Sequence, residues 1–262
     1  MKIGFIGGGN MAEAMIKGME LKGMKHIFVS EPRDTRRNYL HHHYSIDTTE
    51  NNNEVISKCK IIILAIKPQN IETVLNEIGE AVTEDKTVVS IAAGITLDYL
   101  TSKLKTKKII RVMPNTPALV QEGMTVMTLS EGFSDADIST VREIFMSIGK
   151  VLTMPEKYMD AVTALSGSGP AFLALFIEAM VEAGIQTGLD SDSALALAVQ
   201  TAMGTSKLLN TGMSPSTLRE MVTSPGGTTE AGLKVFEKKG FGDTVIKAIK
   251  AAKKRAMELG HK

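Results

Sequence analysis

Short apolar runs alternate with amphipathic stretches along the first 150 residues. The runs predict strands at 3–6, 27–30, 61–65, 87–91 and 109–113, with helices near 10–22, 34–40, 52–58, 69–80 and 97–104 between them. Two further strands, at 124–129 and 150–153, flank a helix over about 134–148. Continuous apolar runs are typical of parallel strands that are covered on both faces. The pattern therefore predicts an α/β domain over residues 1–155, with a doubly wound, mainly parallel sheet.

The pattern changes after Pro155, where no strand-like run follows. Helical periodicity predicts helices near 156–164, 170–187, 191–211, 214–222, 229–239 and 243–259. The stretch 171–187 is apolar nearly all round, with Glu178 and Glu182 as its only charged residues, which is typical of a buried helix. A small helical domain cannot cover such a helix alone. We therefore expect residues 156–262 to form an all-α domain that packs against a second copy of the chain.

The charge balance excludes some classes of partner. The 30 basic and 29 acidic residues nearly cancel, so no strongly basic surface is expected to bind nucleic acid or an anionic membrane. We expect no apolar run to be long enough to span a bilayer, and no signal peptide precedes the first strand. The single cysteine, Cys59, excludes an internal disulfide framework and fits a reducing compartment. These features predict a cytoplasmic protein.

A glycine cluster directly follows the first predicted strand. Gly7, Gly9 and Ala12 fit the fingerprint of a dinucleotide-binding βαβ unit. The first glycine allows a tight turn, the second lets the backbone approach a pyrophosphate, and the small third residue keeps helix and strand close. Glu31 then stands near the position that binds ribose in such units. The sequence thus predicts a Rossmann-type domain that binds a nicotinamide dinucleotide.

A second glycine-rich motif, at 223–232, joins a loop to a predicted helix. The successive amides of Gly226 and Gly227 are expected to face one side and form a concave anion site. Thr228 and Thr229 open the helix, whose N-terminus attracts anions. Taken alone, the motif equally fits an ordinary turn with a threonine cap. Beside a dinucleotide site, it favours binding of a small carboxylate-bearing substrate.

The residues near these motifs favour reduction of an imine. Reduction of a ketone needs a proton donor such as Lys, His or Tyr, but no histidine lies in the predicted site region. A protonated imine already carries its proton and needs one hydrogen-bond partner, which the Thr229 hydroxyl supplies. The run His41-His42-His43 lacks a partnering Cys or acidic cluster, so we expect an exposed turn there and no metal site.

Together these motifs resemble those of the Δ1-pyrroline-5-carboxylate reductase family. The resemblance covers essentially the whole chain and rests on residues 4–12, 65–68, 112–117, 165–171 and 224–229. It implies NAD(P)H-dependent reduction of the C=N bond of 1-pyrroline-5-carboxylate to L-proline, the last step of proline biosynthesis. It also implies a homodimer with interlocked helical domains and an active site shared between the protomers. Assembly of dimers into a higher oligomer is left open.

The resemblance also implies site residues by position. The anion loop would hold the substrate carboxylate, and the Thr229 hydroxyl would also reach the ring nitrogen as the catalytic group. The substrate-binding residues would be Ser224, Gly227, Thr228 and Thr229. The cofactor contacts would be Gly7, Gly9, Asn10, Met11, Ala12, Asn52, Ala65, Lys67, Pro68, Ala93 and Asn115.

The end of the second strand bears on the choice between NADPH and NADH. Glu31 would accept hydrogen bonds from the ribose hydroxyls and repel a 2′-phosphate. The groups that suit this phosphate are Ser30, Arg33, Arg36 and Arg37. The three arginines favour NADPH, with NADH also accepted. An alternative is that Arg36 and Arg37 face solvent on a short helix, so Arg33, which lies nearest the strand end, is the expected phosphate contact.

Two other functions fit part of the pattern. A β-hydroxyacid dehydrogenase shares the two-domain plan but would carry a lysine on the long helix after its glycine-rich loop. Residues 171–187 offer none. A non-catalytic dinucleotide sensor would have no use for an anion loop with paired threonines. Both alternatives are weaker than the imine reductase.

Overall fold

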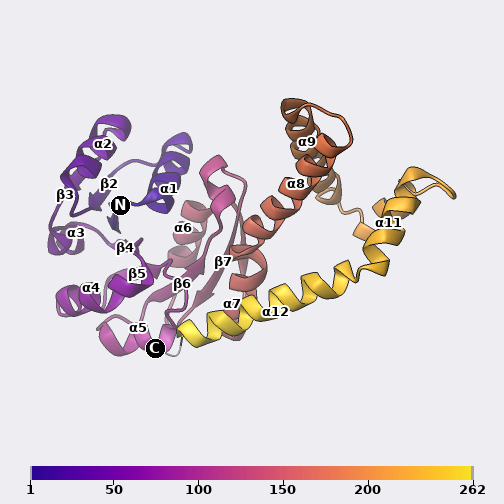
Figure 1. Cartoon of the computed structure of the whole chain (residues 1–262). Helices are drawn as coiled ribbons and strands as arrows, with labels where there is room; N and C mark the ends of the chain where they lie inside the picture. The colour runs from indigo at the N-terminus through magenta and orange to yellow at the C-terminus, as the bar shows by residue number, and fades with distance from the viewer. Residues whose placement is uncertain (1, 261–262) are drawn as a thin grey trace. The chain divides into compact units, whose positions relative to one another are not determined.

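Eight strands form one sheet in the computed structural model of the chain, which describes residues 2–260. They are β1 (Ile3–Ile6), β2 (Ile27–Ser30), β3 (Asp47–Thr49), β4 (Ile61–Leu64), β5 (Thr87–Ser90), β6 (Ile109–Met113), β7 (Gly123–Leu129) and β8 (Gly149–Thr153). The strand order is β3-β2-β1-β4-β5-β6-β7-β8 (Figure 1). All neighbouring strands are parallel except β6 and β7. The order reverses between β1 and β4, where doubly wound sheets bind ligands beyond the carboxyl ends of the strands.

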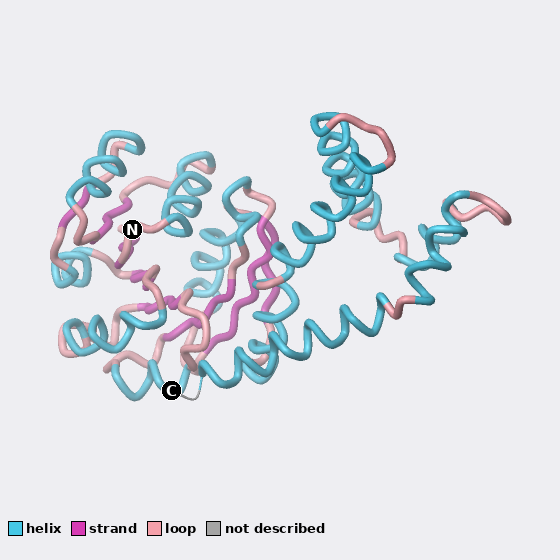
Figure 2. The backbone as a smooth tube through the Cα atoms, in the orientation of Figure 1, coloured by secondary structure: helices cyan, strands magenta, loops and turns pink. Residues whose placement is uncertain are grey.

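Helices cover both faces of this sheet (Figure 2). One hydrophobic core joins the sheet to α1 (Asn10–Leu21), α2 (Asp34–Tyr44) and α6 (Asp135–Met146). The second core joins the opposite face to α3 (Asn52–Lys58), α4 (Ile71–Ile78) and α5 (Leu97–Lys103). Neighbouring strand residues alternate between the two cores, as Phe5 and Ile6 do. The predicted α/β fold is confirmed.

The strand β3 was not predicted from the sequence. It reads Asp-Thr-Thr and lies at the edge of the sheet, paired only with β2 among the described strands. An edge strand need not bury its side chains, so it has no apolar run to reveal it.

Short helices also occupy two segments that follow strands, namely η1 (Pro68–Asn70) and η2 (Thr116–Val120).

The remainder of the described chain is helical. Its elements are η3 (Glu156–Tyr158), α7 (Met159–Val162), the π-helical turn η4 (Thr163–Gly167), α8 (Gly169–Gln186), α9 (Ser191–Leu209), α10 (Pro215–Met221), α11 (Thr228–Lys238) and α12 (Phe241–Gly260). The chain divides into two compact units, Met1–Ser168 with Ala252–Lys262, and Gly169–Ala251. Helix α7 belongs to the sheet unit because Met159 and Val162 are buried against Val126 of β7.

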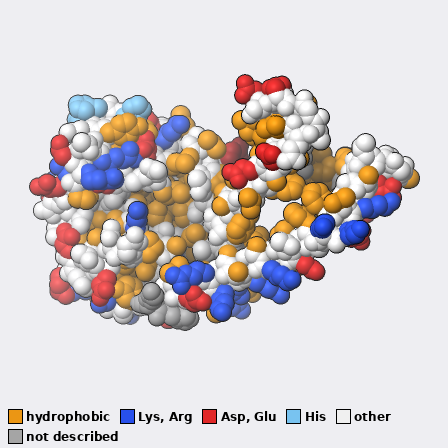
Figure 3. All heavy atoms as spheres, viewed as in Figure 1, with side chains coloured by type: hydrophobic (Ala, Val, Ile, Leu, Met, Phe, Trp, Pro, Cys, Tyr) orange, Lys and Arg blue, Asp and Glu red, His pale blue; other side chains and the backbone are white. Residues whose placement is uncertain are grey.

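Helix α8 is apolar, yet none of its residues is buried within a single chain. Leu175 is 65% exposed, and Figure 3 shows hydrophobic side chains open to solvent over this helix. The helical stretch Glu156–Gln186 is also long and apolar enough to cross a membrane, with a mean hydropathy of 1.5. The prediction that no such run exists was wrong, because Glu178 and Glu182 are too few charges to offset the apolar residues around them.

Candidate functional site

The turn between β1 and α1 has the geometry of a pyrophosphate cradle. Gly7 adopts a φ of 97°, and a Cβ there would lie 2.5 Å from the Ala65 carbonyl oxygen, so this position needs glycine. A Cβ at Gly9 would meet no described atom within 4 Å, which leaves the backbone open to a ligand. Gly9 caps α1 without a side-chain hydrogen bond. The first-turn amides of α1, on Asn10, Met11 and Ala12, therefore face this opening at the positive end of the helix dipole.

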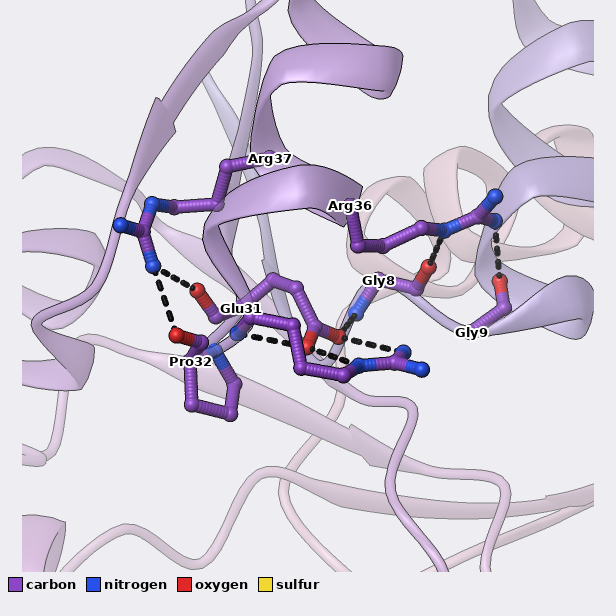
Figure 4. Close-up of polar contacts among 7 residues, drawn as sticks. Gly8, Gly9, Glu31, Pro32, Arg36 and Arg37 are labelled. Atoms are coloured by element: carbon purple, nitrogen blue, oxygen red, sulfur yellow. Dashed lines mark hydrogen bonds and ion pairs between the residues drawn. The ribbon is translucent and has the colours of Figure 1, made fainter.

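Glu31 lies one residue beyond β2, which ends at Ser30, and its carboxylate turns towards the glycine turn. It is 4% exposed and accepts a hydrogen bond from the Gly8 amide at 3.0 Å (Figure 4). It also accepts hydrogen bonds from the Arg33 amide at 3.1 Å and from Arg33 Nε at 2.8 Å. Burial raises the pKa of Glu31, but the bonds from Arg33 and Gly8 outweigh burial and leave it below its ordinary value. Because both oxygens already have donors, the structure weakens the assignment of Glu31 as a ribose ligand.

The three arginines after β2 have different roles. The Arg33 side chain is 65% exposed, whereas those of Arg36 and Arg37 are 18% and 16% exposed. Arg37 Nη1 donates to the carbonyls of Glu31 and Pro32, both at 2.8 Å (Figure 4). Arg36 is similarly engaged with the glycine turn. The prediction that all three suit a 2′-phosphate is therefore wrong for Arg36 and Arg37, whose guanidinium groups bind the protein backbone.

Ser30 and Asn52 lie together at the same edge of the sheet. The Ser30 hydroxyl donates to Asn52 Oδ1 at 2.6 Å, and Asn52 Nδ2 donates to Glu77 at 2.9 Å. Ser30 is buried at the end of β2, and Asn52 opens α3. Two predicted cofactor residues 22 positions apart thus form one polar pair.

The other predicted cofactor residues follow β4, β5 and β6. Pro68 and Ala93 line a cavity of about 460 Å³. Ala65 and Lys67 lie on the short connection from β4 to η1, directly before Pro68. Asn115 follows β6, and its amide is used within the protein. Its Oδ1 accepts the Met124 amide at 2.8 Å, and its Nδ2 lies 3.2 Å from Ser166 Oγ. The Asn115 side chain therefore ties the β6 loop to the π-helical turn.

The loop before α11 is built differently from what its two glycines suggest. Gly226 adopts a φ of 71°, and its amide donates to Glu230 Oε2 at 2.7 Å. The Gly227 amide donates to the Ser224 carbonyl at 3.0 Å. The prediction that these two amides form a concave anion site is wrong, because each already has an acceptor inside the loop. Glu230, on the first turn of α11, reaches back as the acidic residue of a capping box does.

What this loop offers an anion is the first turn of α11. Gly227 caps the helix without a side-chain hydrogen bond, so the helix opens on the Thr228 and Thr229 amides. A Cβ on residue 227 would lie only 2.5 Å from the Ser224 hydroxyl oxygen. The hydroxyl can therefore lie this close to the start of the helix only because residue 227 is glycine. Thr229 is half-buried and Thr228 is exposed. These amides and hydroxyls together form a donor set suited to a carboxylate.

The described residues include no group of three His, Cys, Asp or Glu side chains that could hold a metal ion. The run His41–His43 lies on the last turn of α2, not in the exposed turn that was predicted. His43 stacks on Tyr39 with ring centroids 5.1 Å apart. Cys59 is buried, and burial raises the pKa of its thiol to about 11, which leaves it unreactive at neutral pH.

Sequence reasoning missed one network beside the glycine turn. Glu13 on α1 accepts hydrogen bonds from Tyr39 and Tyr44, both at 2.8 Å, and from Arg36 at 2.5 Å. The signal available in the sequence is weak. Glu13 lies one residue after the fingerprint, while its partners come from a helix that shows no clear apolar pattern.

Comparison with known proteins gives matches to both parts of the chain. Residues 156–259 match the family model described as pyrroline-5-carboxylate reductase dimerisation, and residues 2–94 match NADP oxidoreductase coenzyme F420-dependent. The chain is 40% identical to the pyrroline-5-carboxylate reductase of Synechocystis sp., over 100% of this chain and 99% of that relative.

Solved structures give the same likeness. A pyrroline-5-carboxylate reductase from Coxiella burnetii superimposes with a TM-score of 0.93 at 35% identity, over 98% of both chains. The pyrroline carboxylate reductase of Plasmodium falciparum with NADP bound gives a TM-score of 0.88 at 32% identity, over 99% of this chain and 98% of that one.

Proposed function

Since the chain belongs to the pyrroline-5-carboxylate reductase family, we propose that it reduces the C=N bond of 1-pyrroline-5-carboxylate with NAD(P)H to give L-proline. The observation that carries this proposal is full-length likeness to reductases of that name. Both parts that the reaction needs lie within the matched length. They are the dinucleotide turn after β1 and the donor set at the start of α11.

The proposed reaction does not require a protein side chain to donate a proton. NAD(P)H supplies a hydride to the imine carbon, and the protonated nitrogen takes the electron pair of the C=N bond and becomes a secondary amine. We propose that the Thr229 hydroxyl orients the ring nitrogen by a hydrogen bond. The Ser224 hydroxyl and the first-turn amides of Thr228 and Thr229 bind the carboxylate, while Gly227 lets Ser224 approach. The hydride step therefore needs no proton donor.

The cofactor is held by the β1–α1 turn. Gly9 and the first-turn amides of α1 receive the pyrophosphate, and the exposed Arg33 receives the 2′-phosphate of NADPH. NADPH is then preferred, and NADH is still accepted because the pyrophosphate contacts are common to both. The remaining contacts that we propose are Ser30, Asn52, Ala65, Lys67, Pro68, Ala93 and Asn115.

We propose that residues 1–155 bind the cofactor and that the dimerisation domain begins at residue 156, although the segment up to Ser168 packs with the sheet unit. The matched dimerisation model supports this boundary because it begins at residue 156. The match of residues 156–259 to the dimerisation model supports a homodimer that covers the apolar α8, over a membrane-embedded helix. The protein is proposed to act in the cytoplasm, which agrees with its single cysteine and its nearly balanced 30 basic and 29 acidic residues.

An assay of cofactor oxidation tests this function. The absorbance of NADPH or NADH is followed with 1-pyrroline-5-carboxylate and with a matched panel of 2-keto and 3-keto acids. We expect oxidation only with the cyclic imino acid, and faster with NADPH. Faster reduction of a keto acid would overturn the proposal in favour of a hydroxyacid dehydrogenase. Binding of NADPH without turnover of any substrate would favour a sensor.

A further inference from the structure

Arg36 holds the backbone of the glycine turn from the side of α2. Its Nε donates to the Gly8 carbonyl at 2.6 Å, and its Nη2 donates to the Gly9 carbonyl at 3.4 Å (Figure 4). The same Nη2 donates to Glu13 at 2.5 Å. Arg36 therefore binds two consecutive carbonyls of the turn that is expected to face the cofactor.

Fixing these carbonyls also fixes two amides. In a trans peptide the C=O and the following N–H point in opposite directions, and the described chain has no cis peptide bond. The Gly8 carbonyl shares its peptide plane with the Gly9 amide, and the Gly9 carbonyl shares its plane with the Asn10 amide. Arg36 thus draws the Gly8 carbonyl to one side and reinforces the direction of the Gly9 carbonyl, which also accepts the Glu13 amide at 3.0 Å. The Gly9 and Asn10 amides then point to the other side. A pyrophosphate needs donors on that second side.

Arg36 is itself held in place. Its side chain is 18% exposed, and its guanidinium lies 5.0 Å from the centroid of the Tyr39 ring. Glu13 pairs with it and also accepts hydrogen bonds from Tyr39 and Tyr44. Burial raises the pKa of Glu13, but these hydrogen bonds outweigh burial and keep the carboxylate ionised. Such a network fixes a guanidinium more rigidly than a single ion pair at the surface does.

We propose that Arg36 is a positioning residue for the cofactor, which shapes the turn at Gly8 and Gly9 so that its amides meet the pyrophosphate. It supports NADPH and NADH equally, because the pyrophosphate is common to both. Arg33, in contrast, discriminates between them. The inference rests on the proposed function only in naming the nucleotide, since cofactor binding is measurable without any imine.

Direct titration of the purified protein tests this role. Arg36→Lys keeps the charge but loses the planar fork that binds two carbonyls. We expect the Kd of NADPH and that of NADH, measured by calorimetry, to rise by the same factor of about tenfold, with KM for both rising and kcat little changed. Arg33→Ala should raise the Kd of NADPH alone.

Arg37→Lys is the matched control, because Arg37 makes the same kind of contact to the Glu31 and Pro32 carbonyls. It should leave both Kd values near those of the wild type. A loss confined to NADPH in Arg36→Lys would overturn the proposal and make Arg36 a phosphate ligand. Unchanged Kd values with a lower Tm would make it purely structural, and an equal loss in Arg37→Lys would show general loosening of α2.

A second variant covers the case in which Arg36→Lys fails to fold. Glu13→Gln keeps the shape of the carboxylate but removes its charge, so Arg36 is held less firmly. The Kd values of both nucleotides should rise together by a few-fold. Wild-type affinity in Glu13→Gln would contradict the proposal.

Discussion

Single side chains of the candidate site fall into two groups, those that the protein uses and those left for a ligand. Glu31 and Asn115 were predicted near the cofactor, but their polar atoms are engaged by neighbouring groups of the chain. Ser224 and Thr229 stand at a helix start that no side chain caps. Polar groups free of internal partners are the ones whose replacement should change kinetics without unfolding the protein.

Thr229→Val tests the catalytic hydrogen bond. One such bond contributes about 1–3 kcal/mol, so kcat/KM should fall by roughly tenfold to a hundredfold, mainly through kcat. Ser224→Ala should chiefly raise KM. Steady-state kinetics measures both effects. Thr223→Val is the control, because its hydroxyl bonds the Arg219 carbonyl at 2.6 Å. Full activity of Thr229→Val would show that Thr229 has no catalytic role and serves only as a residue of the first turn of α11.

The lowered pKa of Glu31 should make the free energy of unfolding depend on pH. Its pKa lies below the ordinary value of 4.5 in the folded chain. The stabilisation is therefore complete above that value and is lost as the pH falls through the lower, folded-state pKa. Glu31→Gln should lower Tm at neutral pH and make its fall between about pH 6 and about pH 3 shallower. Calorimetric scans of Glu31→Gln and of Glu20→Gln, an exposed control on α1, check this. Parallel curves for Glu31→Gln and the wild type would contradict it.

At the scale of elements, the β1–α1–β2 unit sets the cofactor site. Its turn places the first-turn amides of α1 beside the carboxyl end of β1, and Arg36 of α2 binds the backbone of this turn. Glycine serves two purposes in this turn. Gly7 is required by the fold, because a side chain there would clash with the backbone of Ala65. A side chain at Gly9 would clash with no described atom and would instead occupy the space where a ligand approaches.

The two glycines should therefore respond differently to replacement by alanine. Gly9 has a φ of −69°, so Gly9→Ala should keep the Tm of the wild type while weakening NADPH and NADH binding by about tenfold or more. Gly7→Ala is the matched comparison. Its φ of 97° and its clash with Ala65 should cost about 1–3 kcal/mol of stability. Thermal unfolding and calorimetric titration separate the two effects. If Gly9→Ala bound both cofactors as the wild type does, the pyrophosphate would not pass over this residue.

At the scale of the whole molecule, assembly explains the apolar helices. The unit Gly169–Ala251 exposes large side chains on several helices, among them Leu175, Leu197 and Val235. Large exposed apolar surfaces of this kind are typical of sites where a protein meets another chain. The match to the dimerisation model indicates that the chain covering this apolar surface is a second copy of the same protein.

Leu175→Glu should abolish the dimer. In the assembled protein it would bury an unpaired charge, which costs several kcal/mol, and activity should be lost with the dimer. Leu21→Glu is the matched control, since Leu21 is 69% exposed on α1, outside the dimerisation domain. Sedimentation and cofactor oxidation are the measurements. A fully active wild-type monomer, or an intact dimer in Leu175→Glu, would contradict the interface.

The sequence by itself determined the order of elements, the nucleotide turn and the helical half. Apolar runs, helical periodicity and glycines act over a few residues, so they are visible in the chain. It could not show β3, the internal acceptors of the Gly226 and Gly227 amides, or the contacts of Arg36. Those depend on which polar groups distant in sequence come within about 3 Å of each other, and only the tertiary structure decides that.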